Sequence, residues 1–373
     1  MKNSKIKIAL IGATRQPSGC CGHPTFVKQM VAHLSPYFSL TVFAERGCKA
    51  DSLQSSQIRK IPFAATGVQG HFYKLASIIY AVFICDVLLI LGVSGAFIIP
   101  VIQFLAPRKK IVVNVDALLW SDSDRSVFAR RFLVMCESAA VRYADEVVAD
   151  NAAIQKYLLD RYDIQAMLIE NGADHSEGRA LDIDTFVKYP FVAVDYAFAQ
   201  ADIIPDNNIH LILKAFARQR RLNLVMVGNW EQSEYGRKLY AEYSFNRRIQ
   251  LLDPISDPQL FDQLRSNAKV YLHSCGGTGQ NAPLTEAMFL GLPVISFDTL
   301  YNRITTDNKA YFFNDSFDLE VMAEAIDLLS LDIVGCHLRA ITWWRNRWSD
   351  TADQYARLFN GTARKNTPIF HFQ

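Results

Sequence analysis

Short apolar runs alternate with helix-period segments along almost the whole chain. The runs are rich in Val, Ile and Leu and nearly uninterrupted, as expected for parallel strands that helices cover on both faces. Strand–helix alternation of this kind predicts a doubly wound α/β architecture. The expected strands are Lys7–Ile11, Leu40–Ala44, Val87–Leu91, Lys110–Asn114, Glu146–Ala149, Met167–Ile169, Phe191–Asp195, Asn223–Val227, Ile249–Leu251, Val270–His273 and Pro293–Phe297.

One polar segment interrupts this alternation and predicts a linker. It runs from Gly172 to Pro190, and a new strand is expected directly after it. A chain of 373 residues suits two domains of about 150–200 residues each. We therefore expect two Rossmann-like domains with doubly wound parallel sheets, residues 1–180 and 190–345, facing each other across a cleft.

The most apolar stretch, Leu75–Leu105, has two interpretations. It is long enough to span a membrane. However, Asp86 lies near its middle, where a carboxylate is costly in lipid, and Gly92, Gly95 and Pro100 break the run. The favoured interpretation is a buried helix over about residues 74–84, a buried strand and a further helix.

Charge and cysteine content restrict the class of protein. Thirty-nine Lys and Arg against 37 Asp and Glu leave a net charge of +2, which argues against a general nucleic-acid-binding protein. Seven cysteines without a C-x-x-C pair indicate reduced thiols and a cytoplasmic protein. The first apolar run, Ile8–Ile11, ends at Gly12 and is too short for a signal peptide.

Two common nucleotide-binding motifs are missing from the sequence. No G-x-G-x-x-G follows the first strand, and no G-x-x-x-x-G-K-[ST] occurs. The sequence therefore lacks the main motifs that would indicate a dinucleotide oxidoreductase or a P-loop enzyme. No His, Cys and Asp cluster has metal-ligand spacing, so we expect neither a metal nor another cofactor.

The strongest candidate site is Ser274–Glu286, which reads SCGGTGQNAPLTE between the strand Val270–His273 and a helix expected to begin near Pro283. Ligands of parallel sheets bind at such strand-to-helix loops. Its glycines let the backbone approach a ligand, and the helix start offers N–H groups to an anion. Glu286, one turn into the helix, is placed to accept hydrogen bonds from a ribose diol. The alternative is a plain turn in which Glu286 only faces the helix dipole.

The stretch Pro283–Val294, PLTEAMFLGLPV, resembles the corresponding helix of GT-B retaining glycosyltransferases. Within that superfamily the chain resembles bacterial rhamnosyltransferase-like enzymes of surface polysaccharide synthesis. The stretches that carry the resemblance follow the family's order over most of the chain. They are Ile11–Phe26, Asn114–Trp120, Tyr143–Tyr157, Ile169–Asp174, Pro205–Leu213, Val227–Tyr235 and Phe297–Arg303.

The resemblance implies a GT-B fold in which a C-terminal helix, residues 346–373, crosses back to the first domain. It implies a nucleoside diphosphate sugar as donor, a glycan or lipid-linked oligosaccharide as acceptor, and metal-independent transfer with retention. Asp116 is the implied catalytic residue. The implied donor-binding residues are Gly22, Gly277, Thr278, Asn281, Pro283, Leu284, Thr285, Glu286 and Arg303, and further candidates for donor or acceptor contacts are Arg15, His23, Asn229 and His273.

Three positions depart from the superfamily pattern. Thr278 stands where a Glu often contacts the donor sugar, and Asp202 and Asn208 stand where an Arg and a Lys usually neutralise the diphosphate. A negative charge at that place repels a diphosphate. A catalytically weakened homologue that acts as a binding or scaffold subunit is therefore the alternative, and a sugar-nucleotide epimerase of the same fold is a third class.

Two further segments bear on whether the protein contacts a membrane or another partner. Arg125–Met135 interleaves Arg130 and Arg131 with apolar residues, which suits a helix with a packed face and a cationic face. The cationic face is either simply solvated or in peripheral contact with the cytoplasmic face of the inner membrane. The tryptophans near the C-terminus are expected to pack in the apolar core between the two domains rather than to anchor an interface with a partner. They are Trp343, Trp344 and Trp348.

Overall fold

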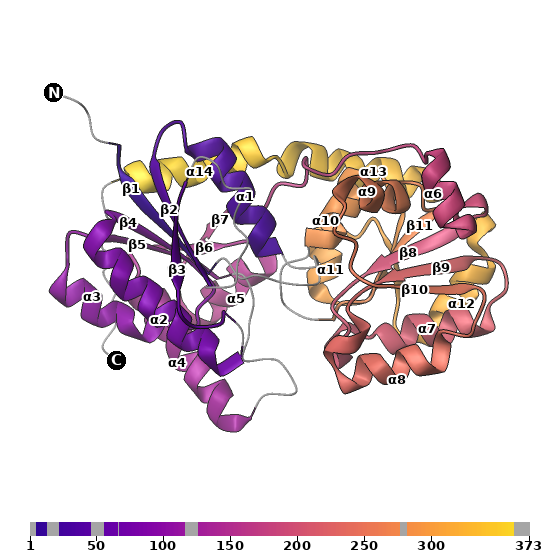
Figure 1. The fold of residues 1–373 in the computed structure, drawn as a ribbon, viewed down its shortest axis with the longest axis horizontal. Coiled ribbons are helices and arrows are strands. Elements are labelled where there is room, and N and C mark those ends of the chain that lie inside the picture. Colours follow the sequence, from indigo (N-terminus) through magenta and orange to yellow (C-terminus); the bar gives the residue numbers. More distant parts are fainter. Residues whose placement is uncertain are drawn as a thin grey trace.

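The computed structural model describes residues 5–12, 22–45, 56–65, 67–115, 126–276 and 282–361. Within them the chain forms two parallel sheets, one in each half of the molecule (Figure 1). The expected architecture of two doubly wound α/β domains is confirmed.

The first sheet has the strand order β3-β2-β1-β4-β5-β6-β7. Ile8 of the inner strand β1 lies opposite Leu40 on one side and Val87 on the other, and both pairings of this strand are parallel. The strands are β1 (Lys7–Ile11), β2 (Ser39–Glu45), β3 (Gln57–Ile61), β4 (Val87–Leu91), β5 (Lys110–Val115), β6 (Glu146–Ala149) and β7 (Met167–Leu168).

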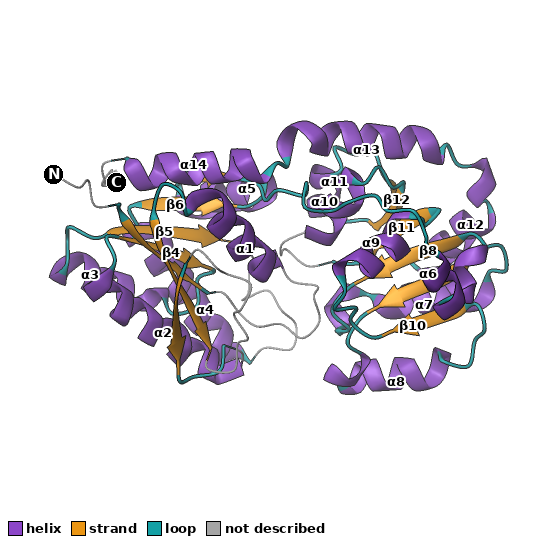
Figure 2. Cartoon of the chain, turned by 45° about the horizontal axis from the view of Figure 1, so that its top comes forward, coloured by secondary structure: helices purple, strands orange, loops and turns teal. Residues whose placement is uncertain are grey.

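Helices cover both faces of this sheet, as its apolar strands require. One face packs against α2 (Gly67–Ile84), α3 (Ile99–Leu105), α4 (Val127–Tyr143) and α5 (Ala152–Tyr162). The other face packs against α1 (Gly22–Leu34) and, from the far end of the chain, α14 (Trp348–Asn360). Figure 2 shows α13 (Leu331–Arg345) over the second sheet and α14 over the first.

The second sheet has the strand order β10-β9-β8-β11-β12-β13 and is also parallel. Its strands are β8 (Tyr196–Gln200), β9 (Asn223–Val227), β10 (Ile249–Leu252), β11 (Val270–His273), β12 (Val294–Phe297) and β13 (Tyr311–Phe313). One face packs against α7 (Ile209–Arg218), α8 (Glu234–Tyr243) and α12 (Ser316–Glu324), and the other against α9 (Pro258–Ser266), α10 (Ala282–Phe289) and α13.

The two domains touch through α11 (Leu300–Thr305) of the second and α5 of the first, where Tyr301 packs against the apolar core of the first domain. This contact brings the loop after β12 next to the first domain. Helix α11 and helix α10 both lie at the end of the second domain that is nearest the centre of the molecule (Figure 1).

The strand expected at Phe191–Asp195 is wrong. Pro190–Ala193 is a 3₁₀ turn, and the strand is Tyr196–Gln200, buried at all five positions. Pro190 lacks the N–H that a central strand needs, whereas it fits the first position of a helical turn. Asp195 pairs instead with Lys269 at 2.7 Å, just outside the amino end of the strand.

Three elements were missing from the expectation. β3 and β13 are edge strands. β3 is mostly exposed and lacks the apolar run of a central strand, and β13 is apolar but only three residues long. The expected linker contains a short helix, α6 (Ile183–Lys188), whose N-cap Asp182 accepts a hydrogen bond from the N–H of Thr185 at 2.7 Å. Its six residues are too few for a periodicity argument.

The apolar stretch Leu75–Leu105 forms a helix, a buried strand and a further helix in the favoured order, but the expectation that the first helix is buried is wrong in part, because Phe83 of α2 is 80% exposed. It contains most of α2, the fully buried β4, a 3₁₀ turn and α3. Among the described residues no helix is both long and apolar enough to cross a membrane.

The placement expected for the three tryptophans is wrong for two of them. Trp348 is 3% exposed and packs in the core of the first domain, but Trp343 is 40% and Trp344 is 81% exposed. Helix α13 turns Trp344 outward, so only the tryptophan at the start of α14 is enclosed.

Helix α4 also differs from its expected pattern. Leu133 is buried, but Phe128 is 83% exposed instead of lying on the packed face. Ser126 caps the helix by accepting a hydrogen bond from the N–H of Ala129, which fixes its start just before Phe128.

Candidate functional site

The loop after β11 is held by its two neighbouring loops. Ser274 Oγ donates to the carbonyl of Asn207 at 2.6 Å, and Asn208 Nδ2 donates to the carbonyl of Ser274 at 3.3 Å. From the other side, Asn302 Nδ2 donates to the carbonyl of Cys275 at 3.0 Å. Three strand-to-helix loops of the second sheet therefore meet at this edge.

Helix α10 begins at Ala282, beside the position expected, and Pro283 stands in its first turn. Pro283 fits there because the first N–H groups of a helix have no intrahelical partner. Leu284 is fully buried, so its side chain belongs to the core and only its backbone can face a ligand. Thr285 and Glu286 are half-buried at the end of the helix nearest the loop.

The carboxylate of Glu286 lies between a guanidinium and an imidazole. Arg265 Nη1 donates to its Oε2, and His175 Nε2 lies 3.3 Å from its Oε1. Arg265, at the end of α9, is 2% exposed. Glu286 itself keeps 14% of its side chain exposed. The carboxylate is thus tied down at both oxygens while part of it still reaches solvent.

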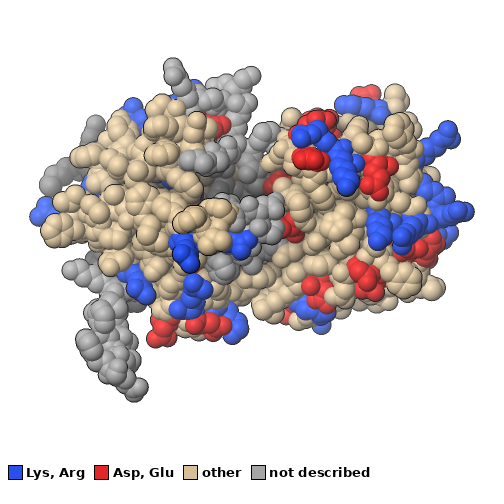
Figure 3. All heavy atoms as spheres, turned by 90° about the horizontal axis from the view of Figure 1, so that it is seen from below, with Lys and Arg blue, Asp and Glu red and all other residues tan. Residues whose placement is uncertain are grey.

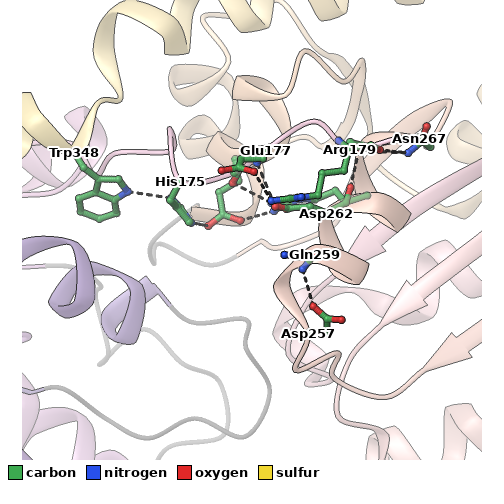
Figure 4. A network of polar contacts seen from close by, with 12 residues as sticks. His175, Glu177, Arg179, Asp257, Gln259, Asp262, Asn267 and Trp348 are labelled. Atoms are coloured by element: carbon green, nitrogen blue, oxygen red, sulfur yellow. Dashed lines mark hydrogen bonds and ion pairs between the residues drawn. The ribbon is translucent and has the colours of Figure 1, made fainter. Parts of the chain in front are cut away.

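Arg265 is fixed by a second set of contacts. Its Nη2 donates to Asp262 at 2.9 Å and to Ser176 Oγ at 3.0 Å, and its guanidinium lies 4.7 Å over the ring of Phe261. Figure 4 shows this chain of contacts running from Trp348 and His175 towards Asp262 and Arg179. A buried guanidinium needs such partners because an unpaired buried charge is strongly unfavourable.

The network sets the charge of Glu286. Burial alone would raise the pKa of this carboxyl, but the positive charge of Arg265 and the hydrogen bond from His175 outweigh burial and lower the pKa to about 2. Glu286 is therefore a carboxylate at neutral pH. An ionised carboxylate only accepts hydrogen bonds, which suits contact with hydroxyl groups.

The chain passes between the two domains twice, once after β7 and once between α13 and α14. These two crossings lie side by side next to the network of Glu286. The N–H of Ala173 donates to the carbonyl of Asn346 at 2.9 Å, and Asn346 Nδ2 donates to the carbonyl of Asn171 at 2.9 Å. The N–H of Trp348 donates to Asp174 Oδ1 at 2.9 Å. The segment after β7 and the turn between α13 and α14 are thus bonded to each other where the chain passes between domains.

Arg303 is already paired. Its Nε and Nη2 donate to Asp298 at 2.5 and 2.6 Å, and its guanidinium lies 4.3 Å over the ring of Phe312. This ion pair lowers the pKa of Asp298. Arg303 therefore adds little net positive charge to the site while the pair is closed.

The departure at Asn208 has a local structural account, whereas the turn contact of Asp202 uses only its backbone carbonyl. Asn207 Nδ2 donates to the carbonyl of Asp202 at 2.8 Å, which closes the turn after β8. Asn208 has φ +52°, a left-handed conformation that Asn tolerates better than Lys, and its amide anchors the neighbouring loop. Asn208 thus stabilises the loop instead of supplying a cation.

The remaining candidates lie in different places. His273 ends β11, is 2% exposed and stacks against Tyr271 with ring centroids 6.4 Å apart. Asn229 follows β9 at the start of a 3₁₀ turn. Gly22 and His23 begin α1, and the side chain of His23 is outside the described part of the chain. Arg15, Asp116, Gly277, Thr278 and Asn281 lie outside the described residues.

Sequence reasoning did not single out Arg265, His175 or Asp262. Arg265 and Asp262 are three residues apart on α9, a spacing that predicts an ion pair but not a buried one. His175 lies in a polar segment without helical or strand periodicity. Among the described residues no group of three or more His, Cys, Asp or Glu is placed to hold a metal ion.

Comparison with known families divides the chain as its two sheets do. Residues 196–335 match the family described as "Glycosyl transferases group 1", and residues 5–174 match a "Domain of unknown function (DUF1972)". A search among curated proteins finds no match.

Solved structures resemble the chain over nearly its full length. Sucrose-phosphate synthase from Thermosynechococcus elongatus has a TM-score of 0.78 at 16% identity, covering 96% of this chain and 98% of that one. Anabaena HepE in complex with UDP and glucose has a TM-score of 0.74 at 16% identity, covering 95% and 99%. WaaG, a glycosyltransferase involved in lipopolysaccharide biosynthesis, has a TM-score of 0.71 at 11% identity, covering 96% and 100%. The chain therefore has the GT-B fold, and its second half is similar to the glycosyl transferases group 1 family.

Proposed function

We propose that the protein is a glycosyltransferase that moves a sugar, such as the deoxysugar rhamnose, from a nucleoside diphosphate to a glycan or lipid-linked oligosaccharide, with retention of configuration. The observation that carries this proposal is Glu286. It stands one turn inside α10 at the carboxyl end of β11, and Arg265 and His175 hold it ionised. The group 1 domain match over residues 196–335 supports the same reaction class.

The chemistry follows from the leaving group. A nucleoside diphosphate gains negative charge as the glycosyl bond breaks, and hydrogen-bond donors placed at that charge lower the barrier. The first N–H groups of α10 are such donors, since a helix start has free N–H groups and a positive dipole end. Glu286 would accept hydrogen bonds from the ribose hydroxyls of the same donor.

Retention needs no protein nucleophile in this proposal. The leaving phosphate oxygen takes the proton of the acceptor hydroxyl as that hydroxyl attacks the same face of the sugar. Asp116, which directly follows β5, would orient the acceptor or the donor sugar. The neighbour HepE was solved with UDP and glucose, so UDP is the first nucleotide to test.

The direct test is donor turnover. We expect the protein to bind a nucleoside diphosphate and to release it slowly from a matching sugar nucleotide, faster when acceptor glycan is added. Nucleotide release is measured by a coupled assay, and the anomeric configuration of the product by NMR. Binding without any turnover across a panel of sugar nucleotides and acceptors would favour the scaffold alternative.

We further propose that the enzyme works in peripheral contact with the cytoplasmic face of the inner membrane, where a lipid-linked acceptor would be presented. The outward surfaces of α2, α3 and α4 support this. Phe83 is 80%, Phe104 is 84% and Phe128 is 83% exposed. Phe132 of α4 joins the helices, because its ring lies 5.3 Å from that of His71 and 5.7 Å from that of Phe97.

The charges of this face fit an anionic surface. The three helices contain one acidic residue, Glu137, which is fully buried and accepts hydrogen bonds from Tyr157 and Tyr162. Arg131 and Arg142 of α4 are exposed. Figure 3 shows this underside of the first domain as a largely uncharged surface with scattered basic side chains and with acidic ones at one edge. Exposed aromatic rings among cations are typical of interfacial membrane binding.

Vesicle sedimentation tests this contact. We expect binding to vesicles of phosphatidylglycerol and phosphatidylethanolamine that weakens with salt, because surface charges are screened. Phe83→Ser with Phe104→Ser should weaken it further. The matched control is Phe245→Ser, an equally exposed phenylalanine (89%) of the second domain. Equal loss with the control would contradict the proposed face.

A further inference from the structure

The hydrogen bonds of His175 fix which of its ring nitrogens carries the proton. Trp348 Nε1 donates to His175 Nδ1 at 3.0 Å. An indole N–H is a donor only, so Nδ1 must be the accepting, unprotonated nitrogen. The proton of the neutral ring is then on Nε2, which lies 3.3 Å from Glu286 Oε1. The tryptophan thereby makes His175 a hydrogen-bond donor to Glu286.

Glu286 keeps acceptor capacity beyond these contacts. Two carboxylate oxygens offer about four acceptor positions. Among the described residues, Arg265 uses one on Oε2 and His175 one on Oε1, which leaves each oxygen a position for a hydroxyl of a ribose diol. The two protein partners bind different oxygens of the carboxylate and so restrict its orientation.

His175 connects this carboxylate to the first domain. Trp348 belongs to the apolar core of the first domain, with its ring centroid 6.0 Å from that of Phe26. Arg265 belongs to α9 of the second domain. The chain Trp348–His175–Glu286–Arg265 therefore passes from one domain to the other beside the two bonded crossings.

We propose that His175 is a positioning residue, which orients Glu286 for the donor ribose and makes that orientation depend on the angle between the two domains. The inference rests on the proposed role of Glu286 in donor binding. When the domains rotate about the crossings, Trp348 moves with the first domain and carries the imidazole with it. Ribose binding then favours the domain angle at which His175 donates to Glu286, since a ligand favours the state that it binds better.

The test compares His175→Ala and His175→Gln with UDP as the probe. Loss of one hydrogen bond to a carboxylate should weaken UDP binding about five- to tenfold in His175→Ala. Glutamine can place an N–H where Nε2 lies, so His175→Gln should recover most of the affinity. His337→Ala, at an exposed histidine of α13, is the matched control and should bind UDP as the unaltered protein does.

Two further measurements separate positioning from a general structural effect. Small-angle X-ray scattering at saturating UDP should show compaction of the unaltered protein, and less compaction in His175→Ala although its site is filled. In ¹⁵N-histidine spectra, His175 should show an unprotonated Nδ1 and a protonated Nε2. Trp348→Phe keeps an aromatic ring in the core but removes the indole N–H, so the preference between the two nitrogens should be lost.

The outcomes distinguish this inference from the proposed function. If Glu286→Gln leaves UDP affinity unchanged, or if the unaltered protein does not bind UDP, the donor role of Glu286 fails and the inference falls with it. If Glu286→Gln weakens binding but His175→Ala changes neither affinity nor compaction, the proposed function stands and the positioning role is overturned. A protonated Nδ1 on His175 in the unaltered protein overturns it as well.

Discussion

Gly172 and Trp348 lie so close together that no side chain fits between them: a Cβ built on Gly172 would stand 2.5 Å from both the Cγ and the backbone nitrogen of Trp348. One residue precedes the second domain and the other begins α14 of the first. The two crossings can bond to each other only because position 172 has no side chain.

Gly172→Ala should therefore push the crossings apart. Backbone cannot yield as a flexible side chain does, so we expect a loss of about 1–3 kcal/mol in the free energy of unfolding, measured by urea denaturation. Gly178→Ala is the control, because nothing lies within 4 Å of a Cβ built there. It should be neutral or slightly stabilising, since alanine restricts the unfolded chain. Equal effects at both glycines would contradict the close packing.

Glu286→Gln should weaken nucleotide binding and also lower stability. The sequence alone predicts an anchoring residue whose replacement leaves the melting temperature almost unchanged. The structure alters that expectation, because the substitution removes a negative charge from beside buried Arg265. We expect a loss of about 1–3 kcal/mol by thermal or urea unfolding. Glu177→Gln, whose partner Arg179 is on the surface, should cost far less.

Acid should remove the contribution of Glu286 to stability. Its pKa is lowered to about 2 in the folded protein, whereas an unfolded glutamate titrates near 4.5. The stabilisation is therefore complete above about pH 4.5 and is lost as the pH falls towards 2, with a total of about 3 kcal/mol. Unfolding free energies from pH 6 to pH 3 should converge for the unaltered protein and Glu286→Gln. A constant difference over that range would contradict the lowered pKa.

Asp116→Asn should reduce transfer much more than nucleotide affinity. Asp116 follows β5 of the first domain, whereas the proposed ribose anchor belongs to the second. The first domain would thus serve mainly the acceptor and the donor sugar. Isothermal titration gives the affinity and product formation gives the rate, with Asp160→Asn on the surface of α5 as control. Parallel losses of affinity and rate would place Asp116 in donor binding instead.

Transfer should not require a divalent metal. The proposed site neutralises the diphosphate with the start of α10 and, where it opens from Asp298, with Arg303. Activity should therefore survive dialysis against a chelator. Activity that disappears with the chelator and returns with magnesium or manganese would show that a metal takes part.

The sequence by itself determined the central strands and the place of the candidate site. Apolar runs such as Val87–Leu91 and Val270–His273 are strands because a parallel sheet covered on both faces needs continuous hydrophobic residues. Local sequence also predicted that Pro283 stands in the first turn of α10, and this start of the helix places Glu286 one turn inside it. These features depend on neighbours in the chain. The strand expected at Phe191–Asp195 shows the limit of such local prediction. Two apolar runs stand next to each other there, and only the pairing of β8 with β9 and β11 determines that the second run forms the strand.

Only the tertiary structure decided what surrounds Glu286. Arg265 lies 21 residues before it and His175 lies in the crossing between domains, while Trp348 comes from the far end of the chain. No spacing rule joins such distant residues, because their contact depends on how α9, α10 and α14 pack on two different sheets. The pairing of Arg303 with Asp298 is equally a matter of geometry. Both are charged residues of the segment after β12, and sequence does not show whether they face a ligand or each other. The sequence thus located the carboxylate, and the packing of the domains determined its charge and its orientation.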